Sequence, residues 1–194
     1  MSSWQPAFDA PAADMLARAF AQDPLHRAAF GASAIVPRNR VFFRVALTLL
    51  AGRRAVVLDG ACVVGFVQVL APADCRQGGR LRWPMLWILF RTLGVRGAVQ
   101  ASMWLQSWVH WTRRQRPSWY VGPIGVDPEY QRRGIGRALL RQTCEILDAA
   151  GAPAVLDTDV EGAVPLYRQH GFEVVTTRRV LGVRVFTMRR QARA

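Results

Sequence analysis

The sequence predicts an α/β domain with a mixed sheet, and three observations support this. Apolar residues recur at helical spacing in the segments before residue 52. Residues 54–72 are instead valine-rich, as strands are. From residue 118 onward, strand and helix patterns alternate, which is typical of a sheet covered by helices. Because no internal repeat or linker interrupts the chain, residues 1–194 are expected to form one domain.

Two amphipathic helices are expected in the first quarter of the chain. Residues 11–22 place Met15, Leu16, Ala19 and Phe20 on one helical face. A second helix is expected over residues 38–52, closing at Gly52.

A hairpin and a series of alternating elements are expected to follow. Asp59-Gly60 interrupts the valine-rich segment and suits a tight turn between antiparallel strands. The later part predicts a strand from 118, a helix ending near Gly151, a strand over 152–159 and a short helix over 163–170. Two last strands are expected to begin at Phe172 and Val183.

A tryptophan-rich helical insert is expected at about 80–117. One helix would carry Trp83 and Trp87, and another Trp104, Trp108 and Trp111. The apolar segment 83–90 falls well short of the roughly 20 residues that a membrane-spanning helix needs. Two interpretations stay open for these tryptophans: ordinary core packing, or an apolar pocket that covers a substrate site.

The charge and cysteine content restrict the class of protein. The formal net charge is +13, and all 26 basic residues are arginine, which favours an anionic ligand. These arginines are scattered, so nucleic-acid binding is a lesser alternative. Three cysteines without paired or metal-ligand spacing predict neither a disulfide framework nor a metal site. Since the first residues lack the pattern of a secretory signal, a cytoplasmic protein is expected.

The segment "QRRGIG", residues 131–136, lies between an expected strand and an expected helix. A Gly-x-Gly turn there lets backbone amides face an anion at the electropositive helix start. Arg132, Arg133 and Arg137 add positive charge, so a phosphate group is the expected ligand. A dinucleotide fingerprint would need glycine at Leu139, and a P-loop would need a lysine that this chain does not contain.

This segment resembles the Q-x-x-G-x-G signature of the GNAT superfamily of acyl-CoA N-acyltransferases. Downstream, "VLDTDVEGAVPLYRQHGFEVV", residues 155–175, is similar to the second motif of that family. The layout, with its helical insert, is most similar to puromycin N-acetyltransferase-like members. The resemblance implies a central mixed, mostly antiparallel twisted sheet flanked by helices.

The resemblance also implies roles for particular residues. Acetyl-CoA would be the co-substrate, with its pantetheine arm on the backbone of a strand that splays from its neighbour. Tyr167 would be the general acid for the departing thiolate, although a phenol merely packed on the sheet stays an alternative. The implied cofactor-binding residues are Ile124, Gly125, Val126, Gln131, Arg132, Arg133, Gly134, Ile135, Gly136 and Arg137.

The implied reaction is direct acetyl transfer to a primary amine of a small molecule or a protein. The scarcity of acidic residues favours a hydrophobic or anionic acceptor, and the implied protein is a monomer or homodimer without stable membrane insertion. A catalytically inactive acyl-CoA-binding or sensing module is an alternative, because Ala163 stands where related proteins often have asparagine. The general base stays open among Asp157, Asp159, Glu129, Glu161, Tyr120 and His110.

Overall fold

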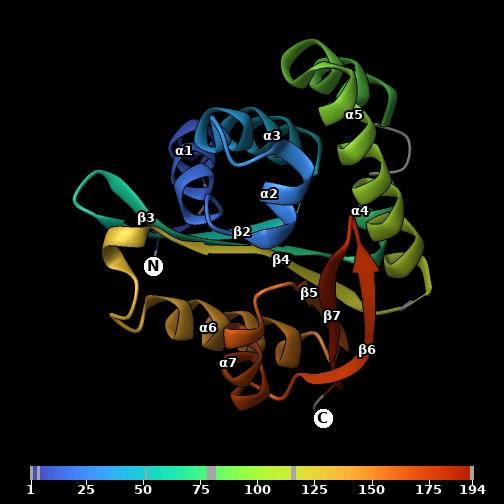
Figure 1. The fold of residues 1–194 in the computed structure, drawn as a ribbon. Coiled ribbons are helices and arrows are strands. Elements are labelled where there is room, and N and C mark those ends of the chain that lie inside the picture. Colours follow the sequence, from blue (N-terminus) through green and yellow to red (C-terminus); the bar gives the residue numbers. More distant parts are fainter. Residues whose placement is uncertain (1, 4, 51, 78–81, 115–116, 193–194) are drawn as a thin grey trace.

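The computed structural model describes residues 2–3, 5–50, 52–77, 82–114 and 117–192. A seven-stranded sheet in the order β1-β2-β3-β4-β5-β7-β6 forms the middle layer. Figure 1 shows α1, α2 and α3 on one face of this sheet and α6 and α7 on the other, with α5 at one side. The predicted α/β class and mixed sheet are therefore confirmed.

Three helices form the first layer. They are α1 (Asp9–Ala19), preceded by the 3-10 turn η1 (Pro6–Phe8), α2 (Pro24–Phe30) and α3 (Ile35–Leu49). The two expected helices correspond to α1 and α3, within a few residues at each end. The separate helix α2 was not predicted, yet its start has a local cause: the Asp23 side chain accepts a hydrogen bond from the His26 amide, and Pro24 takes the first helical position.

The strands follow the predicted order. They are β1 (Ser2–Ser3), β2 (Arg53–Asp59), β3 (Cys62–Leu70), β4 (Trp119–Val126), β5 (Ala154–Thr158), β6 (Glu173–Val180) and β7 (Val183–Arg190). The β2–β3 hairpin turns at Asp59-Gly60 as predicted. Among the described pairings only β4 and β5 run parallel, so the sheet is mixed and mostly antiparallel.

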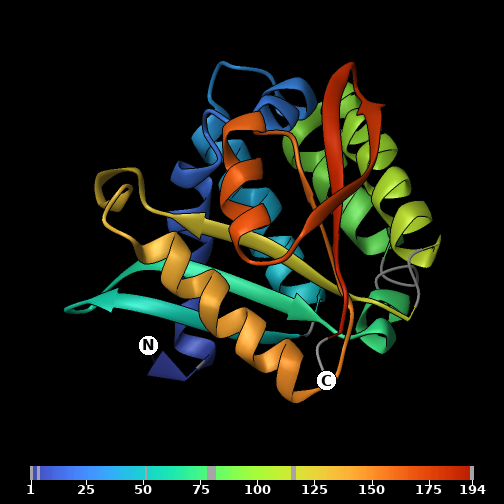
Figure 2. The same cartoon turned by 90° about the horizontal axis from the view of Figure 1, so that it is seen from below.

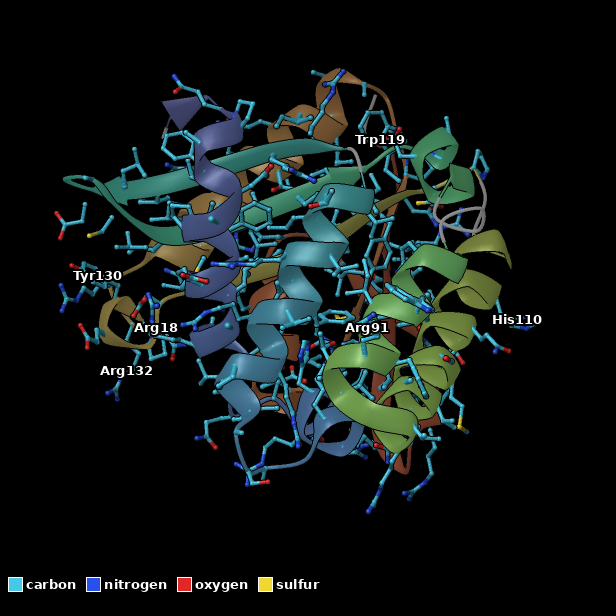
Figure 3. The ribbon with its side chains drawn as sticks, turned by 90° about the horizontal axis from the view of Figure 1, so that it is seen from above. Arg18, Arg91, His110, Trp119, Tyr130 and Arg132 are labelled. Carbon is cyan, nitrogen blue, oxygen red and sulfur yellow. The ribbon has the colours of Figure 1, made fainter. Side chains whose placement is uncertain are left out.

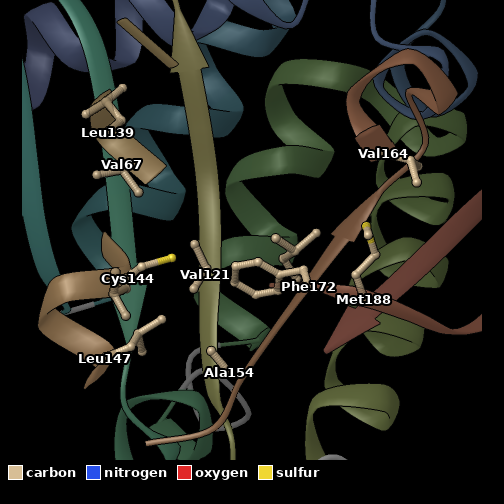
Figure 4. Packing of buried hydrophobic residues seen from close by; sticks show 11 residues of the cluster. Val67, Val121, Leu139, Cys144, Leu147, Ala154, Val164, Phe172 and Met188 are labelled. Atoms are coloured by element: carbon tan, nitrogen blue, oxygen red, sulfur yellow. The ribbon is translucent and has the colours of Figure 1, made fainter. Parts of the chain in front are cut away.

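The second layer packs the main core against the sheet. It contains α6 (Ile135–Ala149), α7 (Val164–Gln169) and two 3-10 turns, η2 (Pro128–Tyr130) and η3 (Glu161–Ala163). Figure 4 shows Leu139 and Leu147 of α6 in the same cluster as Phe172 and Met188. The buried face of α6 includes Leu139, Leu140 and Leu147, whereas Ala150 at its end is exposed.

The insert contains α4 (Pro72–Gln77) and the long helix α5 (Arg82–Arg114). At Gly94 the backbone leaves helical geometry, with φ 71° and ψ 179°, so α5 consists of two helical halves. The prediction of two helices is confirmed in this sense. Among the described residues, no helix is both long and apolar enough to cross a membrane.

Candidate functional site

The strands β4 and β5 separate after a short shared start. Their parallel pairing is limited to Trp119 with Ala154 and Tyr120 with Val155, and Figure 2 shows them diverging beyond that point. On the other side of β4, the register to β3 shifts between Val67 and Val69, which is the mark of a bulge in β4. The backbone from Ile124 to Val126 therefore pairs with β3 and has no ladder partner on the β5 side among the described strands.

The turn after β4 is held by Asp127. The Asp127 amide donates a 2.9 Å hydrogen bond to the carbonyl of Val64 in β3. Its buried carboxylate accepts from Arg18 of α1 at 2.5 Å and from the Glu129 amide at 3.2 Å. This ion pair fixes the position from which the following turn departs, and Figure 3 shows Arg18 on the same side of the molecule as Tyr130 and Arg132.

The start of α6 presents unpaired amides. Gly134 caps the helix with φ 83°, and Arg132 also has a positive φ of 62°. The first amide to donate along the helix is that of Ala138, to the Gly134 carbonyl at 3.0 Å. In the part of the chain that the structure describes, no backbone hydrogen bond is donated by the amides of residues 132–137. An anion placed there would meet these amides and the positive end of α6.

The side chains around this turn are exposed and mostly basic. Gln131 donates back to the Val126 carbonyl at 3.2 Å, and Arg133 donates to the Glu129 carbonyl at 2.9 Å. Arg137 reaches α7, where it donates to the Gln169 side chain at 3.3 Å. These hydrogen bonds tie Gln131 and Arg133 to the preceding segment and Arg137 to α7.

Tyr167 lies on α7 and packs against the core cluster that contains Val121 of β4 and Leu156 of β5. Its ring packs edge-on against Phe172, with centroids 6.4 Å apart. Burial, followed by the nearby charges of Asp23 and Asp159, raises the pKa of Tyr167 to about 12. The phenol therefore stays protonated at neutral pH and keeps a proton to donate.

Two carboxyl groups meet beside this phenol. Asp159, directly after β5, accepts a 2.6 Å hydrogen bond from the Leu25 amide, and Asp23 accepts a 3.0 Å bond from the next amide of α2, that of His26. Burial and then the charge of Asp159 raise the pKa of Asp23 to about 8. At neutral pH this carboxyl group holds its proton beside a second carboxyl group, so the pair ionises fully only in mildly alkaline solution.

Sequence reasoning named Asp159 as a candidate base and missed Asp23. The Asp-Pro dipeptide before α2 was a visible helix-start signal. The dipeptide indicates only that Asp23 caps a helix. No local pattern shows that folding brings Asp23 to the end of β5.

Three other candidate bases are engaged elsewhere. Asp157 forms a two-pronged ion pair with Arg178, with nitrogen–oxygen distances of 3.1 and 2.8 Å. Glu161 pairs with Arg184 at 2.5 Å. Burial raises the pKa of Tyr120, whose ring packs edge-on against Trp108. Each of these groups is thus engaged in an ion pair or in ring packing.

The two remaining candidates are exposed on the surface. Glu129 is exposed in η2, where its carbonyl accepts from Arg133. His110 is exposed on α5, and Figure 3 shows it on the opposite side of the molecule from Tyr130 and Arg132.

His26 of α2 and two tryptophans of the insert, Trp104 and Trp108, have packing roles. His26 is 3% exposed and bonds Asn39 at 2.9 Å, and burial lowers its pKa to about 4. Trp104 stacks on Phe42 with centroids 5.1 Å apart, and Trp108 is buried. Core packing is thus the better interpretation for Trp104 and Trp108. The side chains of Trp83 and Trp111 lie outside the described residues.

Residues 25–172, more than half of the chain, match the acetyltransferase (GNAT) family, and the chain belongs to this family. Enzymes of the family use acetyl-CoA as a co-substrate. The chain is 49% identical over 79 residues to the N-alpha-acetyltransferase RimI of Mycobacterium tuberculosis, covering 37% of this chain and 48% of that protein. It is 40% identical over 76 residues to the mycothiol acetyltransferase of Propionibacterium freudenreichii, covering 35% and 24% respectively. The matches thus span about half or less of the length of these relatives.

Solved structures share the whole fold at low identity. A histone acetyltransferase HPA2-related protein from Corynebacterium glutamicum superimposes with a TM-score of 0.70 and 18% identity, covering 100% of this chain and 96% of that one. The ribosomal-protein-S18-alanine N-acetyltransferase of Escherichia coli gives a TM-score of 0.58 and 17% identity, covering 100% and 93%. These similarities confirm the GNAT fold.

Proposed function

We propose that this protein is an acetyl-CoA-dependent N-acetyltransferase that acts directly on a primary amine. The observation that carries this proposal is the position of Tyr167 beside the Asp23–Asp159 pair, where β4 and β5 diverge. A proton donor and a proton acceptor there suit an aminolysis of a thioester, which must protonate a thiolate and deprotonate an amine. Family membership and the sequence relatives, which are named as N-acetyltransferases, support the same chemistry.

The cofactor would lie between the diverging strands. The free backbone of Ile124 to Val126 suits the amide groups of a pantetheine arm, which would extend the sheet on its unpaired side. The amides of residues 132–137, with Arg132, Arg133 and Arg137, suit its pyrophosphate. This arrangement would place the thioester at the open end of β5, near Tyr167.

The reaction would use three groups of this chain. An amine nitrogen attacks the thioester carbonyl carbon, its extra proton passes to the ionised Asp23–Asp159 pair, and a carbon–nitrogen bond forms. The carbon–sulfur bond then breaks, and the departing thiolate takes a proton from the Tyr167 hydroxyl. The Tyr167 phenolate regains a proton from solvent, and the carboxyl pair releases its proton to solvent. A backbone amide near Val126 would stabilise the developing negative charge on the carbonyl oxygen.

The acceptor is a small molecule or a protein amine. The negative pair beside Tyr167 would attract an ammonium group, whereas the overall charge of +13 repels polycations at a distance. The hydrophobic or anionic acceptor expected from the sequence stays a prediction. A thiol-release screen should compare agmatine, an N-terminal alanyl peptide and an aromatic amine; agmatine as the best acceptor would contradict it.

Replacement of Tyr167 by phenylalanine tests the proposal. Calorimetric titration with acetyl-CoA and thiol release with an accepted amine should show unchanged cofactor affinity and turnover reduced by roughly 10²-fold or more, since one acid contributes about that much. Full turnover in this variant would assign the protonation to another group.

The second candidate is an inactive acyl-CoA-binding module, favoured by Ala163 at the start of α7 where related proteins often have asparagine. Saturable acetyl-CoA binding without turnover by the parent protein on the amine panel would favour this candidate. Absence of acetyl-CoA binding would remove both functions.

A further inference from the structure

The helix α5 exposes an apolar face to solvent. Its side chains include Trp87 at 61% exposure, Phe90 at 51%, Val95 at 65% and Met103 at 55%. The α5 outer face is defined here as Trp87, Ile88, Phe90, Val95, Val99 and Met103. Of the eight large hydrophobic side chains that are exposed in the described part of the chain, six belong to this face. Such concentration on one helix marks an interaction surface rather than scattered exposure.

The part of the α5 outer face that lies beyond the break at Gly94 follows from helix geometry. Val95, Val99 and Met103 recur at four-residue spacing, so they form one stripe along the second half of the helix. The opposite side of that half is buried, with Ala101 and Trp108 packed inward. The helix is therefore apolar on both sides. One side is already occupied by the protein's own core.

Positive charge accompanies these apolar side chains. Arg91 and Arg96 are exposed on α5, and the guanidinium of Arg91 lies 4.9 Å from the ring centroid of Trp87. Between Asp74 and Asp127 the sequence contains no aspartate or glutamate. The same segment contains arginines at positions 76, 80, 82, 91, 96, 113, 114 and 116.

We propose that the α5 outer face binds peripherally to an anionic lipid surface. Tryptophan and phenylalanine partition into the boundary between headgroups and acyl chains, while flanking arginines attract anionic headgroups. A helix that lies in this boundary needs an apolar face and basic neighbours, and it does not need the length of a membrane span.

Charge complementarity favours a lipid surface over other occupants. A second copy of the chain would bring two proteins of formal charge +13 into contact through arginine-bearing helices. The phosphate groups of a nucleic acid would pair with the arginines, but Trp87, Phe90 and Val95 would then have no apolar partner. This proposal is independent of the acetyltransferase proposal, since no residue of the α5 outer face contributes to the site around Tyr167.

Vesicle co-sedimentation of the full chain tests the proposal. Vesicles of phosphatidylglycerol and phosphatidylcholine should bind the protein at least about tenfold more strongly than pure phosphatidylcholine, and added salt should weaken the binding. The double variant Trp87→Ser/Phe90→Ser and the double variant Arg91→Gln/Arg96→Gln should each lower the partition coefficient about tenfold or more.

Two matched control variants distinguish vesicle binding through the α5 outer face from binding through apolar or basic residues elsewhere on the surface. The double variant Val160→Ser/Val175→Ser removes two apolar side chains of 43% and 49% exposure elsewhere on the surface. Arg141→Gln/Arg179→Gln removes two charges from α6 and β6. Both controls should bind anionic vesicles as the parent protein does, and all variants should show the parent's thermal unfolding temperature.

Three results would overturn the proposal. One is no binding of the parent to anionic vesicles, and another is equal losses in the control variants and the α5 variants. The third is a dimer in solution, measured by light scattering, that Trp87→Ser/Phe90→Ser dissociates while vesicle binding is absent. That result would assign the α5 outer face to a second copy of the chain.

Discussion

Asp159, the first residue after β5, accepts a 2.6 Å hydrogen bond from the backbone amide of Leu25 in α2. This bond joins the end of a central strand to the start of a helix on the other side of the site. It sets the Asp159 carboxyl group beside Asp23, the cap of the same helix, and both groups beside Tyr167. The candidate acid and the candidate base thus depend on one contact between distant parts of the chain.

The pH dependence of turnover should report the Asp23–Asp159 pair. Because the pKa of Asp23 is raised to about 8, kcat/KM should fall as the pH decreases below that value. Asp159→Asn removes the neighbouring negative charge that contributes to this shift, so the fall should move to lower pH. Asp23→Asn should lose most of the turnover. The measurement is a pH–rate profile with one fixed amine.

A fixed amine matters because the ionisation of the acceptor also affects the profile. The ionisation of the amine is the same for every variant. A shift of the pH–rate profile in Asp159→Asn is therefore caused by a group of the enzyme. Glu129→Gln, an exposed change in η2, is the control and should keep the parent profile. An unmoved profile in Asp159→Asn would exclude the pair as the proton acceptor.

The stability of the protein should depend on Asp23 in a defined direction. The pKa of Asp23 is about 8 in the folded protein and near 3.8 for an unperturbed aspartate, so the folded state holds a proton that the unfolded state releases between these values. The favourable contribution is complete below about pH 4 and is lost as the pH rises through about 8. Asp23→Asn, which keeps an N-cap, should therefore stabilise the protein at pH 9 relative to the parent but not at pH 4.

Urea denaturation at these two pH values measures the difference in the free energy of unfolding. The predicted gain in the free energy of unfolding of Asp23→Asn over the parent grows with pH. A gain that is equal at pH 4 and pH 9 would show that Asp23 does not hold its proton in the folded protein.

The glycine that begins α6 should control cofactor affinity. Gly134 and Gly182 have nearly equal φ values, 83° and 82°, and a Cβ atom at either position would meet nothing within 4 Å. Gly134→Trp should abolish acetyl-CoA binding in calorimetry, because the indole would cover the amides of the turn. Gly182→Trp, with the same backbone strain in the β6–β7 turn, should bind as the parent does. Equal binding by both variants would place the pyrophosphate elsewhere.

The ion pair between Asp157 and Arg178 should stabilise the fold. Its side chains are 15% and 13% exposed, so Arg178→Met leaves a nearly buried carboxylate without its partner and should cost about 3 kcal/mol of unfolding free energy. Arg184→Met breaks the exposed pair with Glu161 and should cost less than about 1 kcal/mol. Equal costs would contradict the structural role of Asp157 and reopen its candidacy as a base.

Much of the architecture was predictable from local patterns. The Asp59-Gly60 turn between valine-rich segments indicates the β2–β3 hairpin, because the turn type and strand propensity are properties of neighbouring residues. The same holds for "QRRGIG" at the start of α6, where glycine permits the positive φ of residue 134. Helix α2 was missed, since seven residues are too few for a clear period.

What the sequence by itself determined is the order of most elements, the family resemblance and the Gly-x-Gly turn before α6, all of which depend on residues close together in the chain. What only the tertiary structure decided is which side chains share an environment. Asp157 and Asp159 stand two positions apart on the same segment, yet one pairs with Arg178 and the other joins Asp23. Their roles depend on contacts contributed by distant segments, and these contacts are not encoded in local spacing.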